Sequence, residues 1–153
     1  MARVENYEVK RIPGLRHDGR RRGLAFLDSK TDKSIDAKPA YETLKQKQKG
    51  DLFNRFDYWM DGGIYDRYFH GWPNNPIYKH CFVFKLKIAG AHHRWYGFLI
   101  NPRPLTDRSF LVCILASHAQ KNMEHTDPSE LDGQNRLRLN LEVIKAVKKK
   151  FPE

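Results

Sequence analysis

Three apolar runs between positions 80 and 119 constrain the fold of this chain more than any other feature. The first, Cys81–Ile88, alternates strictly, so one side of a strand is apolar and the other carries lysines. A tight turn at 89–91 leads into a second strand over 93–100, and Ser109–Ala116 supplies a third that is apolar on both sides. The sequence therefore predicts an antiparallel three-stranded meander with an apolar inner face.

Helical patterns precede and follow this meander in the chain. Residues 36–62 carry a proline suited to a first turn and an apolar stripe, which predicts a helical hairpin or one kinked helix. Residues 127–150 predict a C-terminal helix, because Thr126 or Asp127 can cap it and Pro128 fits its first turn. Its expected apolar stripe consists of Leu131, Leu137, Leu141, Ile144 and Val147.

The rest of the chain consists of two segments. Residues 1–35 are basic and contain one predicted short strand, and residues 63–79 are aromatic and typical of an ordered loop. A single core comfortably organises 153 residues, so we expect one α+β domain over 1–153. Its central sheet, with strands within 80–119, is expected to be antiparallel. Helices are expected on one face and a basic cleft on the other.

The charge of the chain limits its partners. Lysine and arginine number 28 against 18 aspartates and glutamates, which gives a formal net charge of +10 and favours binding to a polyanion. No stretch approaches the roughly 20 apolar residues of a membrane-spanning helix, and Met1–Asn6 lacks the apolar run of a secretory signal. We therefore expect a cytoplasmic protein with no membrane partner. Its two isolated cysteines, Cys81 and Cys113, are expected to be buried thiols.

Residue types suited to RNA gather on the polar side of the predicted meander. Lys85 and Lys87 share one face of a strand, so both can approach phosphates. Arg94 and Tyr96 share a face of the next strand, where the ring offers a stacking surface for an unpaired base. The basic run Arg20-Arg21-Arg22, punctuated by glycines, is a further candidate for phosphate contact.

The same surface suits cleavage of RNA without a metal. In that reaction the ribose 2′-hydroxyl attacks the neighbouring phosphorus, which requires a base, an acid and cations that stabilise the pentacoordinate phosphorus. His118, His93 and Lys121 are the candidate proton carriers. Arg94 and Lys87 are the candidate charge stabilisers. No zinc-ligand spacing and no nucleotide-binding fingerprint occurs, so neither a metal nor a cofactor is expected.

The order of a strand, helices, three antiparallel strands and a C-terminal helix resembles the RelE/HigB-like toxins of bacterial toxin–antitoxin systems. The likeness runs from Cys81 to Leu137 and is carried by Phe84–Lys87, His93–Tyr96, Ile114–Asn122 and Thr126–Leu131. It implies a RelE-like fold and a toxin that cleaves translated mRNA in the ribosomal A site without a metal. An acidic antitoxin protein would hold such a toxin inactive. By matched position, the resemblance assigns working roles to Lys85, Lys87, Arg94, Lys121 and His118.

Two other functions use the same sequence features. A non-catalytic RNA- or ribosome-binding protein would use the same basic surface and lose affinity gradually as its cations are removed. A protein-interaction module would instead dock a partner on the aromatic segment 63–79, where Trp72 and Tyr68 would matter more than any lysine. The fold alone does not decide between these functions.

Overall fold

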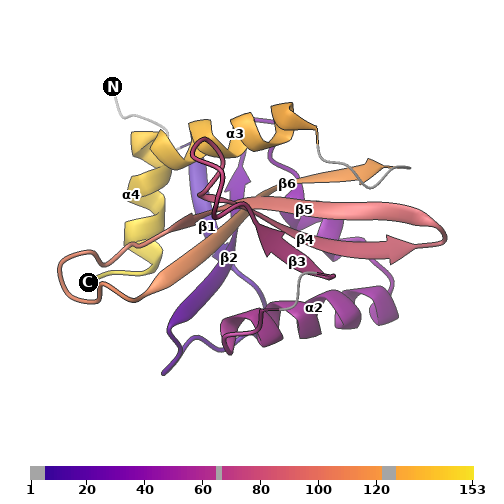
Figure 1. Ribbon diagram of the computed structural model, residues 1–153, viewed down its shortest axis with the longest axis horizontal. Coiled ribbons are helices and arrows are strands. Elements are labelled where there is room, and N and C mark those ends of the chain that lie inside the picture. The colour runs from indigo at the N-terminus through magenta and orange to yellow at the C-terminus, as the bar shows by residue number, and fades with distance from the viewer. Residues whose placement is uncertain (1–5, 65–66, 122–126) are drawn as a thin grey trace.

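Across residues 6–64, 67–121 and 127–153, which the computed structural model describes, a six-stranded mixed β-sheet forms the centre of the molecule (Figure 1). The strands are β1 Tyr7–Arg11, β2 Arg22–Ser29, β3 Phe69–Gly71, β4 Cys81–Ile88, β5 Ala91–Ile100 and β6 Leu111–Lys121, in the order β1-β2-β6-β5-β4-β3. The helices are α1 Ala37–Glu42, α2 Gln46–Met60, α3 Pro128–Leu139 and α4 Leu141–Lys150. The α+β class predicted from the sequence is therefore confirmed.

β4, β5 and β6 pair antiparallel with one another, as the sequence predicts. The predicted alternation of β4 is also confirmed. Phe84 and Leu86 belong to the core beneath α2, whereas Val83 packs on the other side of the sheet, toward α3. Because successive residues of a strand point to opposite faces, Lys85 and Lys87 share the face of Val83.

The sequence pattern does not reveal β2. It predicts one strand in the N-terminal segment, but β1 and β2 form an antiparallel pair there, and β2 also pairs in parallel with β6. Residues 23–27 are buried without interruption, because core clusters lie on both faces of the sheet at this point. A short run without polar alternation is typical of such a doubly covered strand. The expectation of an entirely antiparallel sheet is therefore wrong.

Helices cover both faces of the sheet, which corrects the expectation of helices on one face only. Tyr41 of α1 and Phe56 of α2 pack on one face, against Phe26 of β2. Val143 and Val147 of α4 belong to the core on the other face. Figure 1 shows α3 above the sheet, α4 at its left side and α2 below it. The basic residues therefore gather near an edge of the sheet rather than on a bare face.

The C-terminal segment forms two helices rather than one. Asp127 caps α3 as predicted, because its side chain accepts a hydrogen bond from a backbone N–H of the first turn (2.9 Å). Asn140 then leaves the helical conformation (φ −72°, ψ 123°), and its side chain caps α4 in the same way. The break leaves Leu141 81% exposed, so the predicted continuous stripe is wrong at this residue. In the described ranges, no helix is both long and apolar enough to cross a membrane.

β3 lies within the aromatic segment that the sequence predicts to be a loop. It pairs antiparallel with the first half of β4, where Phe69 is opposite Phe84. The backbone N–H of Lys85 then donates to the carbonyl oxygen of Tyr68 (2.7 Å), and the pairing ends there. The remainder of β4 therefore forms an outer edge of the sheet in the described part of the chain. The candidate site lies beside this edge.

Candidate nucleic-acid interface

Two rows of paired residues cross the outer half of the meander. In one row, Lys87 of β4 is opposite His92 of β5, and His92 pairs through its backbone with Lys121 of β6. In the other, Lys85 is opposite Arg94. Directly opposed residues of an antiparallel pair have Cβ atoms about 4.5–5.5 Å apart on the same face. The strands thus bring together three of the predicted site residues, and the side chain of Lys121 lies outside the described part of the structure.

A cleft of about 470 Å³ lies where α2, the segment before β3 and the outer half of the β4–β5 hairpin meet. Its lining residues are Asp51, Arg55, Arg67, Tyr68, Lys85, Leu86, Lys87, His92, His93 and Arg94. Five of them are lysines or arginines, and only Asp51 is acidic. A concave surface lined by one sign of charge raises the local concentration of the opposite ion. The cleft is therefore suited to a polyanion such as a nucleic-acid backbone.

Arg55 fastens α2 to the edge of β4. Its guanidinium donates a hydrogen bond to the carbonyl oxygen of Lys85 and lies 4.0 Å from the ring centroid of Tyr68. The guanidinium of Arg67 lies 5.7 Å from the same centroid. Burial is the main cause that lowers the pKa of Arg55, yet a guanidinium stays protonated at neutral pH. Arg55 therefore closes part of the sheet edge and adds positive charge to the cleft.

His93 and His118 form a close pair on the opposite face of the meander from Lys85 and Lys87. Nδ1 of His93 lies 2.9 Å from Nε2 of His118, and the Trp95 ring packs near both imidazoles. Burial is the largest cause that lowers the pKa of each imidazole. A lowered pKa favours the neutral form that a general base needs at neutral pH. His93 lines the cleft, and its hydrogen bond to His118 can fix its tautomer.

Two residues that the sequence predicts to be accessible are buried. Arg94 is 1% exposed and lies at the base of the cleft. Tyr96 is 0% exposed and packs with Val83 and Leu131 beneath α3. The expectation that Tyr96 stacks on a base is therefore wrong. The alternation that sets Tyr96 on the same face as Arg94 also turns its ring into the core under α3.

The basic run at residues 20–22 does not line the cleft. Arg20 donates a hydrogen bond to the carboxylate of Asp57 (2.7 Å). Arg22 donates to the carbonyl oxygens of Trp59, in the last turn of α2, and of Gly63, just after it, at 2.8 and 3.2 Å, where a cation complements the helix dipole. These two side chains, expected to contact phosphates, instead join the start of β2 to α2. Phosphate contact by Arg21, which is exposed, stays a prediction.

Histidine, cysteine and acidic side chains do not form a group of three or more suited to a metal in the part of the chain that the structure describes. Cys81 and Cys113 are buried and unbridged, as predicted. Burial raises the pKa of Cys81 to about 11 and that of Cys113 well above its ordinary value. Both are therefore neutral thiols rather than reactive thiolates. The predicted capping residue Thr126 lies outside the described residues.

Among the basic residues and histidines that line the cleft, sequence reasoning missed three as site residues: Arg55, Arg67 and His92. His92 has the same position in the alternation as Arg94, so it can be found once the strand is extended to its start. Arg55 flanks the apolar stripe of α2, and Arg67 lies in the aromatic segment. Neither carries a local signal, because their place in the cleft depends on how α2 packs against β4.

Comparisons with known proteins assign no family to the chain. No family model matches it, and neither a curated protein nor a solved structure gives a significant match. A functional conclusion therefore rests on the residues, distances and charges of the cleft.

Proposed function

We propose that the chain is a ribosome-dependent mRNA endoribonuclease that inhibits translation, as the toxin of a type II toxin–antitoxin pair. The observation that carries this proposal is the cleft in which five cationic residues and two histidines meet beside the outer edge of β4. The element order supports it, because helices separate an N-terminal strand pair from three antiparallel strands and two helices follow. The sequence resemblance to RelE/HigB-like toxins points the same way.

The proposed reaction needs no metal. The 2′-hydroxyl oxygen forms a bond to the adjacent phosphorus while the bond from phosphorus to the 5′ oxygen breaks, which leaves a 2′,3′-cyclic phosphate and a 5′-hydroxyl. We assign the base to His93, since burial lowers its pKa and His118 fixes its orientation. Lys87 and Arg94 line the same cleft from the other face of the meander, and they stabilise the charge that develops on the phosphorane. Lys121, in the row next to His92, supplies the proton for the leaving oxygen.

An acidic antitoxin protein is the expected inhibitor of this toxin. The chain carries a formal charge of +10, and the cleft concentrates part of that charge beside the proposed catalytic groups. Opposite charge speeds association and disfavours wrong partners. An acidic segment that occupies the cleft would exclude mRNA by competing for the same cations.

Non-catalytic binding of RNA is the second candidate, and one observation favours it. Lys85, Lys87 and Arg94 share one face of the meander, whereas His93 and His118 lie on the other. Phosphate contacts on the lysine face do not require the histidine pair. A binding protein of this kind would leave the RNA intact, and each lost cation would weaken binding in a salt-dependent way.

The decisive experiment is induced expression in a bacterial host, with growth and the integrity of a reporter mRNA followed together. The proposal predicts growth arrest with translation-dependent cleavage. We expect the double variant Lys85→Ala/Lys87→Ala to lower the cleavage rate by roughly 10²–10³, the usual effect of removing charge stabilisation from a transition state. The matched control is Lys148→Ala/Lys149→Ala, which removes the same charge from exposed positions at the end of α4.

The outcomes separate the two candidates. Normal growth with intact mRNA, from a folded protein, contradicts the nuclease. RNA binding without cleavage, weakened in Lys85→Ala/Lys87→Ala and retained in the α4 control, supports the binding protein instead. Arg94→Ala is a poorer test on its own, because Arg94 is buried and its loss also disturbs packing. Its thermal unfolding must therefore be measured beside its activity.

A further inference from the structure

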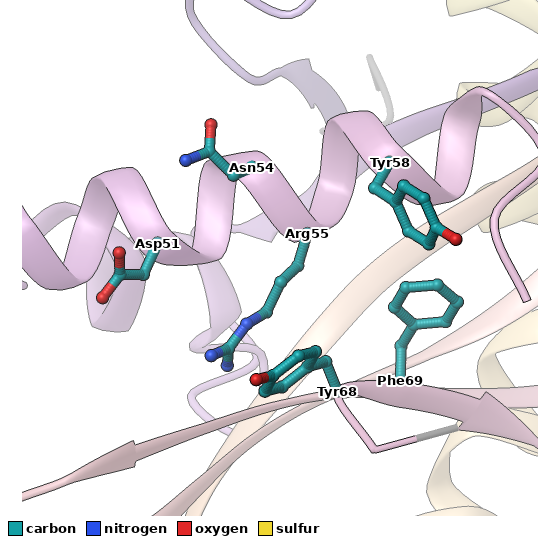
Figure 2. Close-up of a pocket in the computed structure, with 6 residues that line it drawn as sticks. All are labelled: Asp51, Asn54, Arg55, Tyr58, Tyr68 and Phe69. Atoms are coloured by element: carbon teal, nitrogen blue, oxygen red, sulfur yellow. The ribbon is translucent and has the colours of Figure 1, made fainter. Parts of the chain in front are cut away.

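A second cavity, of about 460 Å³, lies between α2 and β3 (Figure 2). Its lining residues are Asp51, Asn54, Arg55, Tyr58, Tyr68 and Phe69. Figure 2 shows the side chains of Arg55 and Tyr58 directed from the helix toward Tyr68 and Phe69, whereas Asn54 points away from them. Half of the lining residues are aromatic, so the cavity is suited to a flat ring rather than to a phosphate.

This cavity adjoins the basic cleft. Asp51, Arg55 and Tyr68 line both. Arg55 stands at the boundary, since its guanidinium contacts the Tyr68 ring and donates to the backbone of Lys85 in the cleft. A ligand that spans both spaces needs anionic groups on one side and a planar ring on the other. Single-stranded RNA has this composition, and proteins bind it by pairing a cationic groove with aromatic side chains.

Tyr58 is held in position as a stacking surface. It is 51% exposed, although it is a large aromatic residue. A Cβ atom at Gly63 would lie 2.3 Å from the Tyr58 ring, so the glycine backbone packs directly on it. The ring centroid of Phe69 lies 6.1 Å from that of Tyr58. Because these contacts limit the motion of the ring before any ligand arrives, little side-chain freedom is lost when a base stacks on it.

We propose that this cavity receives one unpaired nucleobase of the RNA strand whose phosphates contact the basic cleft. The inference rests on the proposed RNA binding and adds the part of the substrate that cations alone do not recognise. The base stacks on Tyr58. Tyr68 and Phe69 line the same cavity from the side of the sheet. The aromatic segment before β4 thereby contributes directly to substrate binding.

The test uses the full chain and a short single-stranded RNA at low salt. In a series of otherwise identical oligonucleotides, one abasic site is moved along the strand, and binding is measured by fluorescence anisotropy. We expect one abasic position to weaken binding to the wild-type protein about tenfold, as expected for loss of one base–aromatic stack. Tyr58→Leu keeps an apolar side chain without a ring and should remove this position dependence. Tyr58→Phe should retain it.

Three outcomes contradict the proposal, and they differ in whether the proposed RNA-binding cleft survives. An equal loss at every abasic position overturns the base-binding cavity. So does a position-dependent loss that Tyr58→Leu does not change. In both cases the cleft proposal survives if Lys85→Ala/Lys87→Ala still weakens binding of all the oligonucleotides. If no RNA binds the wild-type protein at low salt, the RNA-binding cleft and the base-binding cavity both fail.

Discussion

Two basic regions of the molecule differ in what their cations contact. The run at residues 20–22 is contiguous in sequence, and Arg20 and Arg22 bind a carboxylate and carbonyl oxygens of α2 and the residues after it. The cleft draws its cations from α2, the segment before β3, β4 and β5, and they converge on one concave surface. Two of the three arginines that are adjacent in sequence make internal contacts. The cationic residues of the cleft are scattered in sequence, and the fold brings them together.

The difference follows from where each region lies relative to a helix end. The C-terminal carbonyl oxygens of α2 lack partners within the helix and carry partial negative charge, so a nearby arginine is drawn to them. Arg22 donates a hydrogen bond to the carbonyl oxygen of Trp59, and its guanidinium lies 5.0 Å from the ring centroid of the same residue. At the cleft, the paired strands hold Lys85 opposite Arg94 and Lys87 opposite His92. Closely placed cations favour an anionic ligand.

The first prediction tests the internal role of the arginine run and has the largest expected effect on stability. We expect Arg22→Ala to lower the free energy of unfolding by about 2 kcal/mol, because it removes the charged donor from two part-buried carbonyl oxygens. Chemical denaturation checks this. The control is Arg16→Ala, which removes an exposed arginine of the same segment and should change stability by less than about 0.5 kcal/mol. If the two variants lose equal amounts of unfolding free energy, the contacts of Arg22 with the end of α2 do not stabilise the fold.

The second prediction concerns Gly63, which contacts both the arginine run and the proposed base-binding cavity. Its carbonyl oxygen accepts a hydrogen bond from Arg22, and its Cα packs on the Tyr58 ring. We expect Gly63→Ala to destabilise the protein by about 1 kcal/mol, because the new methyl group must displace the ring or the backbone. It should also weaken base-dependent RNA binding, although no aromatic atom is removed. Unchanged base dependence would show that the position of the Tyr58 ring does not matter.

The alternation of β4 is enough to predict from sequence that Lys85 and Lys87 share a face, because period-two patterning is a local property. The contacts of Arg22 are not predictable in this way, since they depend on β2 packing beside the end of α2. β2 itself is a short apolar run whose parallel partner, β6, lies far away in sequence. His93 and His118 have the opposite position in the alternation from the lysines, and of these two histidines His93 lines the cleft beside them.

The third prediction uses pH and has a smaller expected effect. Burial lowers the pKa of His93 and His118, and that of His17 and His80 as well. These groups bind protons less readily in the folded chain than in the unfolded one. Their contribution to stability is therefore complete above the unfolded pKa of about 6.5 and is lost as the pH falls through the lower folded values. We expect the melting temperature to fall on acidification, less steeply in His118→Gln than in the wild type. If the melting temperature of His118→Gln falls with pH as steeply as that of the wild type, His118 does not contribute to this pH dependence.

The last prediction compares one cation from each region, Lys87 and Arg21, by the salt dependence of RNA binding. Both side chains are exposed, so neither substitution by Ala should disturb the core. Each phosphate contact to single-stranded RNA contributes about 0.7 to the slope of log K against log salt. Lys87→Ala should lower that slope by about one contact, because Lys87 lines the cleft. Arg21→Ala should leave it unchanged if the basic run serves only the fold. A lower slope in Arg21→Ala would instead show that the RNA extends from the cleft to the start of β2. Arg21 would then bind RNA, unlike the other two arginines of the run, which make internal contacts.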